Sequence, residues 1–93
     1  MVLIKSVSPL GKYRVLLEFS TGEQKTVDLD PLLRGLVFEP IRSSRAMFRS
    51  VRVDEELGTI VWPNGADMDP DVLYYGLTPA WMEIEREFAQ ETQ

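Results

Sequence analysis

The sequence predicts one small α+β domain, in which an antiparallel sheet of about five strands is combined with short helices and a C-terminal amphipathic helix. Apolar and polar residues alternate with a period of two in the first third of the chain. Proline and glycine signals bound short helices further on, and apolar residues recur at helical spacing near the C-terminus. With 93 residues, of which 44% are hydrophobic, the chain can bury one core. We therefore expect a single domain over residues 1–93.

Three strands are expected in the first third of the chain. Residues 3–7 form the first, and residues 13–19 the second, in which apolar side chains occupy every other position. Thr21 and Gly22 supply a turn, since glycine adopts positive φ without strain. Residues 24–28 then return as the third strand. The expected arrangement is an antiparallel meander.

Short helical turns and a second hairpin are expected in the middle of the chain. Asp30 and Pro31 predict a turn through residue 33, and Ser43 or Ser44 is suited to cap another that runs to Phe48. Residues 36–38 are all apolar and are expected to fill the core from a connecting segment. Residues 51–53 and 59–62 read as two strands joined by the polar residues 54–58.

Two helices are expected in the last quarter. Asp69 and Pro70 predict a short helix over residues 70–75 that stops at Gly76. Residues 77–93 then form a terminal amphipathic helix of about three turns, because its apolar residues fall at spacings of three and four. They are Trp81, Ile84 and Phe88. This stripe either packs on the domain's own sheet, which we favour, or contacts a second copy or another protein.

The composition excludes several kinds of site. Without His or Cys, the chain has no Ser-His or Cys-His pair and no usual zinc site. Asp67, Asp69 and Asp71 alternate like the start of a calcium loop, but Val72 and Thr78 stand where that loop needs glycine and glutamate. These acids are therefore expected to cap and solvate a helix N-terminus. We predict no metal and no cofactor.

No catalytic group is expected either. Asp28 or Asp67 together with Tyr74 would have the chemistry for general acid and base work. Nothing in the sequence brings these side chains together. The prediction is a chain that is not an enzyme.

Charge is distributed unevenly along the chain, whose net charge is −5. Residues 34–52 carry five arginines against one acid, and residues 53–93 carry ten acids against one arginine. Four of these arginines are spaced by three, four and three positions, which would give a basic stripe on one continuous helix. The strand pattern at Val51 and Val53 is expected to interrupt that helix. This arginine cluster consists of Arg42, Arg45, Arg49 and Arg52. It is either a solvated face paired with the acidic C-terminal half, which we favour, or a patch for phosphate or an acidic partner. The overall acidity disfavours nucleic acid.

The sequence also bears on the compartment. No apolar run approaches the roughly 20 residues that a membrane span requires, and Met1 is not followed by a secretory leader pattern. We expect a cytoplasmic chain without a membrane partner.

The order of these features resembles a known family. The most specific part is Trp62-Pro63-Asn64-Gly65 followed by Asp67 and by Leu73-Tyr74. Over about residues 2–75 the chain is similar to the bacterial family called domain of unknown function 2442. The resemblance implies a small antiparallel sheet with short helices, as in the N-terminal domains of some helix-turn-helix regulators. It also implies a binding role, since members are similar to the small partners in two-gene arrangements that look like toxin and antitoxin pairs.

The family signature, Trp62, Pro63, Asn64, Gly65, Asp67 and Tyr74, is expected to hold the fold together. Pro63 belongs at a strand end because it cannot donate to the ladder. Asn64 and Gly65 are suited to reverse the chain, and Trp62 and Tyr74 would bracket the turn and pack on each other. A binding surface at this motif is the alternative.

Two functional hypotheses follow. The first is a noncatalytic protein-binding module, the antitoxin-like or regulatory member of a gene pair. It would contact its partner through the arginine cluster or through the stripe that contains Trp81. A homodimer formed through the terminal helix is also possible under this hypothesis. The second is a nucleic-acid-associated regulator that binds through the arginine cluster.

Overall fold

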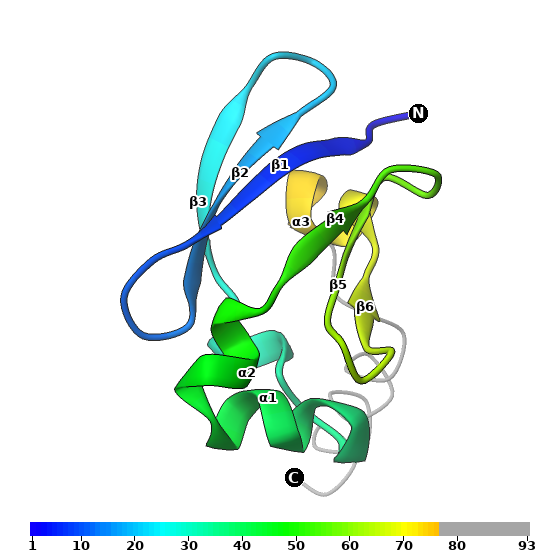
Figure 1. Cartoon of the computed structure of the whole chain (residues 1–93). Coiled ribbons are helices and arrows are strands. Elements are labelled where there is room, and N and C mark those ends of the chain that lie inside the picture. Colours follow the sequence, from blue (N-terminus) through cyan, green and yellow to red (C-terminus); the bar gives the residue numbers. More distant parts are fainter. Residues whose placement is uncertain (77–93) are drawn as a thin grey trace, which may run out of the picture.

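A computed structural model describes residues 1–76 (Figure 1), and the α+β class is confirmed. The predicted terminal helix, with Trp81, Ile84 and Phe88, lies outside the described residues. The elements in chain order are β1 (Ile4–Pro9), β2 (Arg14–Phe19), β3 (Gln24–Asp28), η1 (Asp30–Leu32), η2 (Leu36–Phe38), α1 (Glu39–Ser43), α2 (Arg45–Arg49), β4 (Arg52–Asp54), β5 (Thr59–Val61), β6 (Asp67–Met68) and α3 (Pro70–Tyr75).

The first sheet is the predicted antiparallel meander, in the order β1-β2-β3. Val15 lies opposite Val27, and Leu17 lies opposite Val7 on one side and Lys25 on the other. The period of two places Val15, Leu17 and Phe19 on one face, where each is at most 1% exposed. This face supplies much of the core.

The prediction of about five strands in one sheet is wrong. Strands β4, β5 and β6 form a second antiparallel sheet of three strands, and the chain between β3 and β4 is taken up by η1, η2, α1 and α2. That helical stretch leads the chain away from the first meander before β4 begins, as Figure 1 shows. Strand β6 was not predicted, since two residues are too few to show an alternation.

The two sheets share one core and are joined at Gly58. The backbone N–H of Ile4 in β1 donates to the Gly58 carbonyl across 2.9 Å, and the Gly58 N–H donates to Asp54 across 2.7 Å. Ile4 and Ile60, one from each sheet, are both almost fully buried. The join therefore combines backbone pairing with apolar burial.

Residues 36–49, here called the helical segment, comprise η2, α1 and α2 at one end of the molecule (Figure 1). The prediction that Ser43 or Ser44 caps a turn is confirmed at Ser44, whose side chain accepts from the Met47 N–H and starts α2. Phe48 and Ile41 are buried and fix the segment to the core. Helix α1 was not predicted.

The expectation that residues 36–38 fill the core is wrong for two of the three. The side chain of Leu36 is 88% exposed and that of Val37 is 48% exposed. Phe38 alone of the three packs against the core. A helical turn separates neighbouring side chains by about 120°, so three consecutive residues cannot all face inward.

Helix α3 confirms its predicted limits. Asp69 caps it by accepting from the Asp71 N–H at 2.8 Å, Pro70 opens it, and Gly76 ends it at φ 68°. Leu73 is buried, and the Tyr74 ring packs edge-on against Phe19 with 4.9 Å between centroids. Within residues 1–76 no helix is long and apolar enough to cross a membrane.

Candidate functional site

The Trp62-Pro63-Asn64-Gly65 signature joins the second sheet to the helical segment. The Trp62 side chain is 2% exposed, and its indole Nε1–H donates to the Phe48 carbonyl of α2 across 3.1 Å. Asn64 Nδ2 donates to the Val37 carbonyl of η2 across 2.7 Å. We call these two side-chain contacts the signature clamp. They fix both ends of the helical segment.

The local geometry of the turn agrees with its predicted form. The β5 strand ends before Trp62, Asn64 Oδ1 accepts from the Ala66 N–H at 3.2 Å, and Gly65 has φ 91°. Pro63 and Asp67 are exposed. The turn therefore needs glycine at position 65 and an amide at position 64, which supports the structural interpretation of the signature.

The two aromatic residues of the signature take different partners. Trp62 meets Phe38 edge-on, with 6.0 Å between ring centroids. Tyr74 packs instead on Phe19 and Tyr75. The expectation that Trp62 packs on Tyr74 is therefore wrong, since the two rings contact different aromatic side chains.

The arginine cluster is divided among three elements. Arg42 lies on α1, Arg45 and Arg49 lie one turn apart on α2, and Arg52 lies on β4 opposite Val61. The predicted interruption of the stripe is confirmed, because α2 ends at Arg49. Arg45, Arg49 and Arg52 are exposed.

Arg42 works within the fold. Its Nη1 donates to the side-chain Oδ1 of Asp30 and to the Asp30 carbonyl, the latter at 3.3 Å. Its guanidinium carbon lies 5.3 Å from the centre of the Tyr13 ring, and the Tyr13 hydroxyl donates to the Arg42 carbonyl across 2.8 Å. Arg42 thus braces α1 against η1 and the turn before β2, whereas the other three arginines of the cluster are free of this role.

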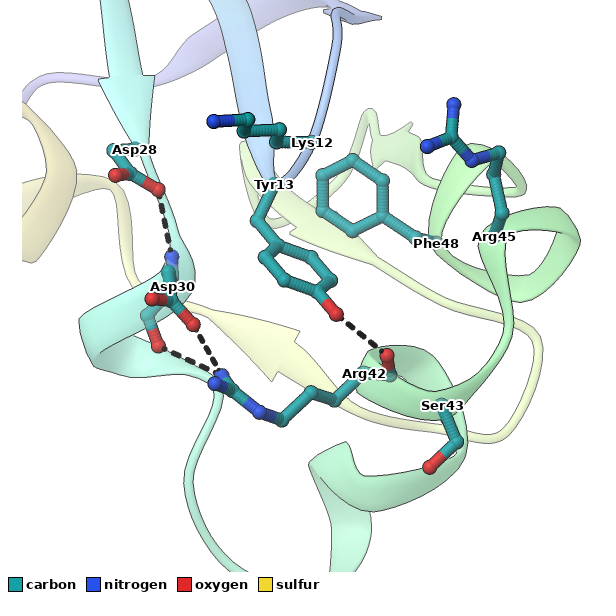
Figure 2. A pocket seen from close by; sticks show the side chains of 8 residues that line it. All are labelled: Lys12, Tyr13, Asp28, Asp30, Arg42, Ser43, Arg45 and Phe48. Atoms are coloured by element: carbon teal, nitrogen blue, oxygen red, sulfur yellow. Dashed lines mark hydrogen bonds and ion pairs between the residues drawn. The ribbon is translucent and has the colours of Figure 1, made fainter.

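A cleft of about 440 Å³ opens between the turn that joins β1 to β2 and the helices α1 and α2 (Figure 2). We call it the cationic cleft. Tyr13 and Phe48, whose rings meet edge-on at 5.6 Å, form its floor. Lys12 and Arg45 stand at its rim on separate elements, and Figure 2 shows the ion pair of Arg42 and Asp30 crossing its lower side. The remaining acid in the lining is Asp28.

A second hollow of about 640 Å³ adjoins the cationic cleft, since Tyr13, Arg42 and Ser43 line both. Its other end is lined by Leu33 and Leu36. Leu36 and the neighbouring Val37 are the exposed apolar side chains of η2, and we call them the apolar tip. Cations and apolar groups therefore border one continuous stretch of surface.

Within the described residues the acidic side chains do not converge on a metal site. No group of three or more Asp and Glu side chains in residues 1–76 is placed to hold a metal ion. The Tyr74 hydroxyl, which we considered with Asp28 and Asp67, donates to Glu23. This hydrogen bond raises the pKa of Tyr74 above its ordinary value of 10.0. A phenol with a raised pKa is a poorer proton donor near neutral pH.

Sequence reasoning missed Lys12, Tyr13 and the apolar tip as surface features. The one signal for Lys12 is the neighbouring Gly11, which marks a turn. Nothing local distinguishes Leu36 from a core leucine, because its exposure depends on where the rest of the chain lies.

Comparison with known proteins gives a family but no relative of known role. No curated protein and no solved structure matches the chain. A family model matches residues 4–79, which include both sheets, the helical segment and the signature clamp. The chain therefore belongs to the family described as protein of unknown function DUF2442.

Proposed function

We propose that this chain is a noncatalytic protein-binding module, the antitoxin-like or regulatory member of a bacterial two-gene pair, and that it acts in the cytoplasm. The observation that carries the proposal is the apolar tip, where two neighbouring apolar side chains face outward next to cations. Its backbone is held in place by Asn64, which donates to the Val37 carbonyl. A surface that is apolar, cationic and fixed in shape suits a protein partner.

The energetics of the apolar tip favour such a partner. Full burial of a leucine or valine side chain contributes about 1.5–3 kcal/mol relative to exposure. Because the signature clamp already orders the η2 backbone, a partner would not have to supply that ordering free energy. The tip therefore has the properties of an interface anchor.

Copurification followed by reconstitution tests the proposal. The tagged full chain is purified from its native cell, the copurifying protein is identified, and its dissociation constant is measured by calorimetry with both purified proteins. Leu36→Asp should weaken binding about tenfold or more, which corresponds to the burial lost. Leu57→Asp is the matched control, because Leu57 is 60% exposed but lies in the β4–β5 turn.

Asn64→Ala probes the clamp itself. This variant keeps both apolar side chains and removes their backbone tether, so binding should weaken, and the melting temperature should also fall because the bond from the Ala66 N–H is lost. A chain that emerges alone from the native cell, or a partner that Leu36→Asp and Leu57→Asp bind equally, would contradict the proposal.

The exposed pair Arg45 and Arg49 on one face of α2 favours one alternative, binding to nucleic acid. A gel shift with DNA or RNA that weakens strongly between about 50 and 200 mM salt would support it. If this gel shift is lost in Arg49→Gln but unchanged in Leu36→Asp, nucleic-acid binding replaces the protein-binding proposal.

A further inference from the structure

We infer that the cationic cleft binds carboxylate side chains of an acidic, partly apolar segment of the partner protein. The inference rests on the proposed function and specifies the chemistry that the partner must present. Three features of the cleft carry it: unneutralised cations at the rim, a strained lysine, and continuity with the apolar tip.

The charges of the cleft favour an anionic ligand. The Arg42 guanidinium and the Asp30 carboxylate form an ion pair and neutralise each other. Asp28 keeps its negative charge while its carboxylate accepts from the Asp30 N–H at 3.0 Å, so three cations against two carboxylates leave the lining with a net charge of +1. Within residues 1–76 no carboxylate lies within ion-pair distance of Lys12 or Arg45. Both side chains are exposed and stand on opposite elements of the rim (Figure 2).

Lys12 holds its position at a conformational cost. Its φ is 58°, the one positive φ of a non-glycine residue in residues 1–76. Left-handed backbone is unfavourable for residues with a Cβ and is normally filled by glycine or asparagine. The turn is closed by hydrogen bonds on both sides, from Leu10 N–H to the Arg14 carbonyl and from Arg14 N–H to the Gly11 carbonyl. A strained lysine that points over a cleft indicates a use for its ammonium group.

The shape of the surface favours a peptide over a small molecule. Small-molecule sites bury most of their ligand, whereas Lys12, Asp28 and Arg45 are all exposed. The cleft continues past Tyr13 and Arg42 into the hollow that ends at Leu36. An extended segment with carboxylates at one end and an apolar side chain at the other would match both ends.

Nucleic acid matches the cleft less well. A phosphate backbone carries a charge at every nucleotide and would meet Asp28 and Asp30 as well as the cations. The Arg42 guanidinium lies 5.3 Å from the centre of the Tyr13 ring, and Phe48 meets that ring at 84°, so less of the ring is open to base stacking. A peptide can place isolated carboxylates opposite Lys12 and Arg45.

The test uses the full chain and a synthetic peptide of alternating glutamate and leucine, with a glutamine and leucine peptide as control. Backbone amide NMR spectra should shift at residues 11–14 and 42–48 with the glutamate peptide and not with the glutamine peptide. Lys12→Gly and Arg45→Gln should each weaken binding about tenfold, the loss expected for a charge-assisted hydrogen bond.

Two controls distinguish a loss of affinity at the cleft from a general electrostatic effect and from misfolding. Arg52→Gln makes the same charge change outside the cleft and should leave affinity within about twofold. Lys12→Gly relieves the backbone strain, so its melting temperature should stay the same or rise. Equal weakening by Arg45→Gln and Arg52→Gln, or amide shifts away from the cleft, would overturn the inference.

The identified partner separates this inference from the proposed function. If Leu36→Asp abolishes partner binding while Lys12→Gly and Arg45→Gln leave it unchanged, the cleft assignment is wrong and the protein-binding function stands. If no partner exists but the glutamate peptide still binds at the cleft, the function fails and the cleft chemistry stands. An oligonucleotide that displaces the peptide from residues 11–14 would overturn the assignment to a peptide.

Discussion

The hydroxyl of Tyr74 lies against the carboxylate of Glu23, which is 51 positions away in the sequence. The backbone carbonyl of Tyr74 accepts from Lys25 Nζ across 2.6 Å, and the Lys25 ammonium lies 4.3 Å from the ring centre. One residue of α3 is thus bound to the residue before β3 and to a residue within β3. At this point a single side chain connects the last described helix to the first sheet.

This contact gives the fold a pH dependence. The pKa of Tyr74 is raised because its neutral hydroxyl donates to the Glu23 carboxylate. The folded state therefore favours the neutral phenol, so the stabilisation is fully present below about pH 10 and is lost as the pH rises through the raised pKa. Ultraviolet absorbance of tyrosinate during alkaline titration should show a late-titrating tyrosine that disappears in Tyr74→Phe.

Glu23→Gln is the matched variant, since it keeps the shape and removes the negative charge. The late transition should move to lower pH in this variant. A titration curve that is the same in Glu23→Gln and in the wild type would show that the hydrogen bond does not govern the pKa of Tyr74.

Individual residues show what the sequence can and cannot reveal. Asp69, and either Ser43 or Ser44, were predicted as caps because capping depends on neighbours within three positions, and Asp69 and Ser44 take that role. The exposure of Leu36 and the bond between Tyr74 and Glu23 could not be predicted, because both depend on segments that are distant in the chain. The cationic cleft has the same origin, since Lys12 and Arg45 come to line one cleft only after folding.

At the scale of elements, Gly58 sets how closely the two sheets approach. A Cβ built on Gly58 would lie 2.7 Å from the Leu3 Cβ, and φ at this position is 69°. Gly58 is buried, and its carbonyl receives the Ile4 N–H. The backbone of β1 can reach the β4–β5 turn because position 58 carries no side chain.

Gly58→Ala should therefore lower the free energy of unfolding by about 2–4 kcal/mol, from positive φ and overpacking together. Gly22→Ala is the control, because Gly22 has φ 90° but open space around it, and it should cost about 1 kcal/mol. Urea denaturation of both variants measures the difference. Equal losses would show that Leu3 moves aside and that the close contact does not matter.

Element types were largely predictable, whereas their assembly was not. Strands β1, β2 and β3 follow from alternation and turn chemistry, and α3 follows from its proline and glycine signals. The division into two sheets follows from α1 and η2, whose short helical turns carry no clear period in the sequence. An alternating sequence pattern predicts where strands lie, but it does not predict which strands pair with each other in a sheet.

For the molecule as a whole, Trp62 joins the second sheet to the helical segment and lies in the shared core. Trp62→Ala should lower the free energy of unfolding by about 3–5 kcal/mol, a large share of the roughly 5–15 kcal/mol typical of a small domain. Trp62→Phe keeps an aromatic ring and removes the bond to Phe48, so it should cost less. Urea denaturation followed by circular dichroism measures both losses.

The stability and the partner binding of Trp62→Ala together distinguish the two interpretations of the signature, as a fold-holding motif and as a binding surface. A Trp62→Ala variant that melts like the wild type but fails to bind its partner would show that the signature is a contact surface. A variant that loses stability and recovers binding when it is folded at low temperature would show that the signature acts through the fold.

The packing of Tyr74 on Phe19 has a consequence for synthesis on the ribosome. The strands of the first sheet emerge early, yet Phe19 receives its aromatic cover from α3, which emerges last of the described elements. Until then the inner face of the meander lacks that cover and resembles the partly folded states that associate with other chains. The protein can therefore complete its core only after the codons for α3 have been translated, and a nascent chain that stalls before them would expose Phe19.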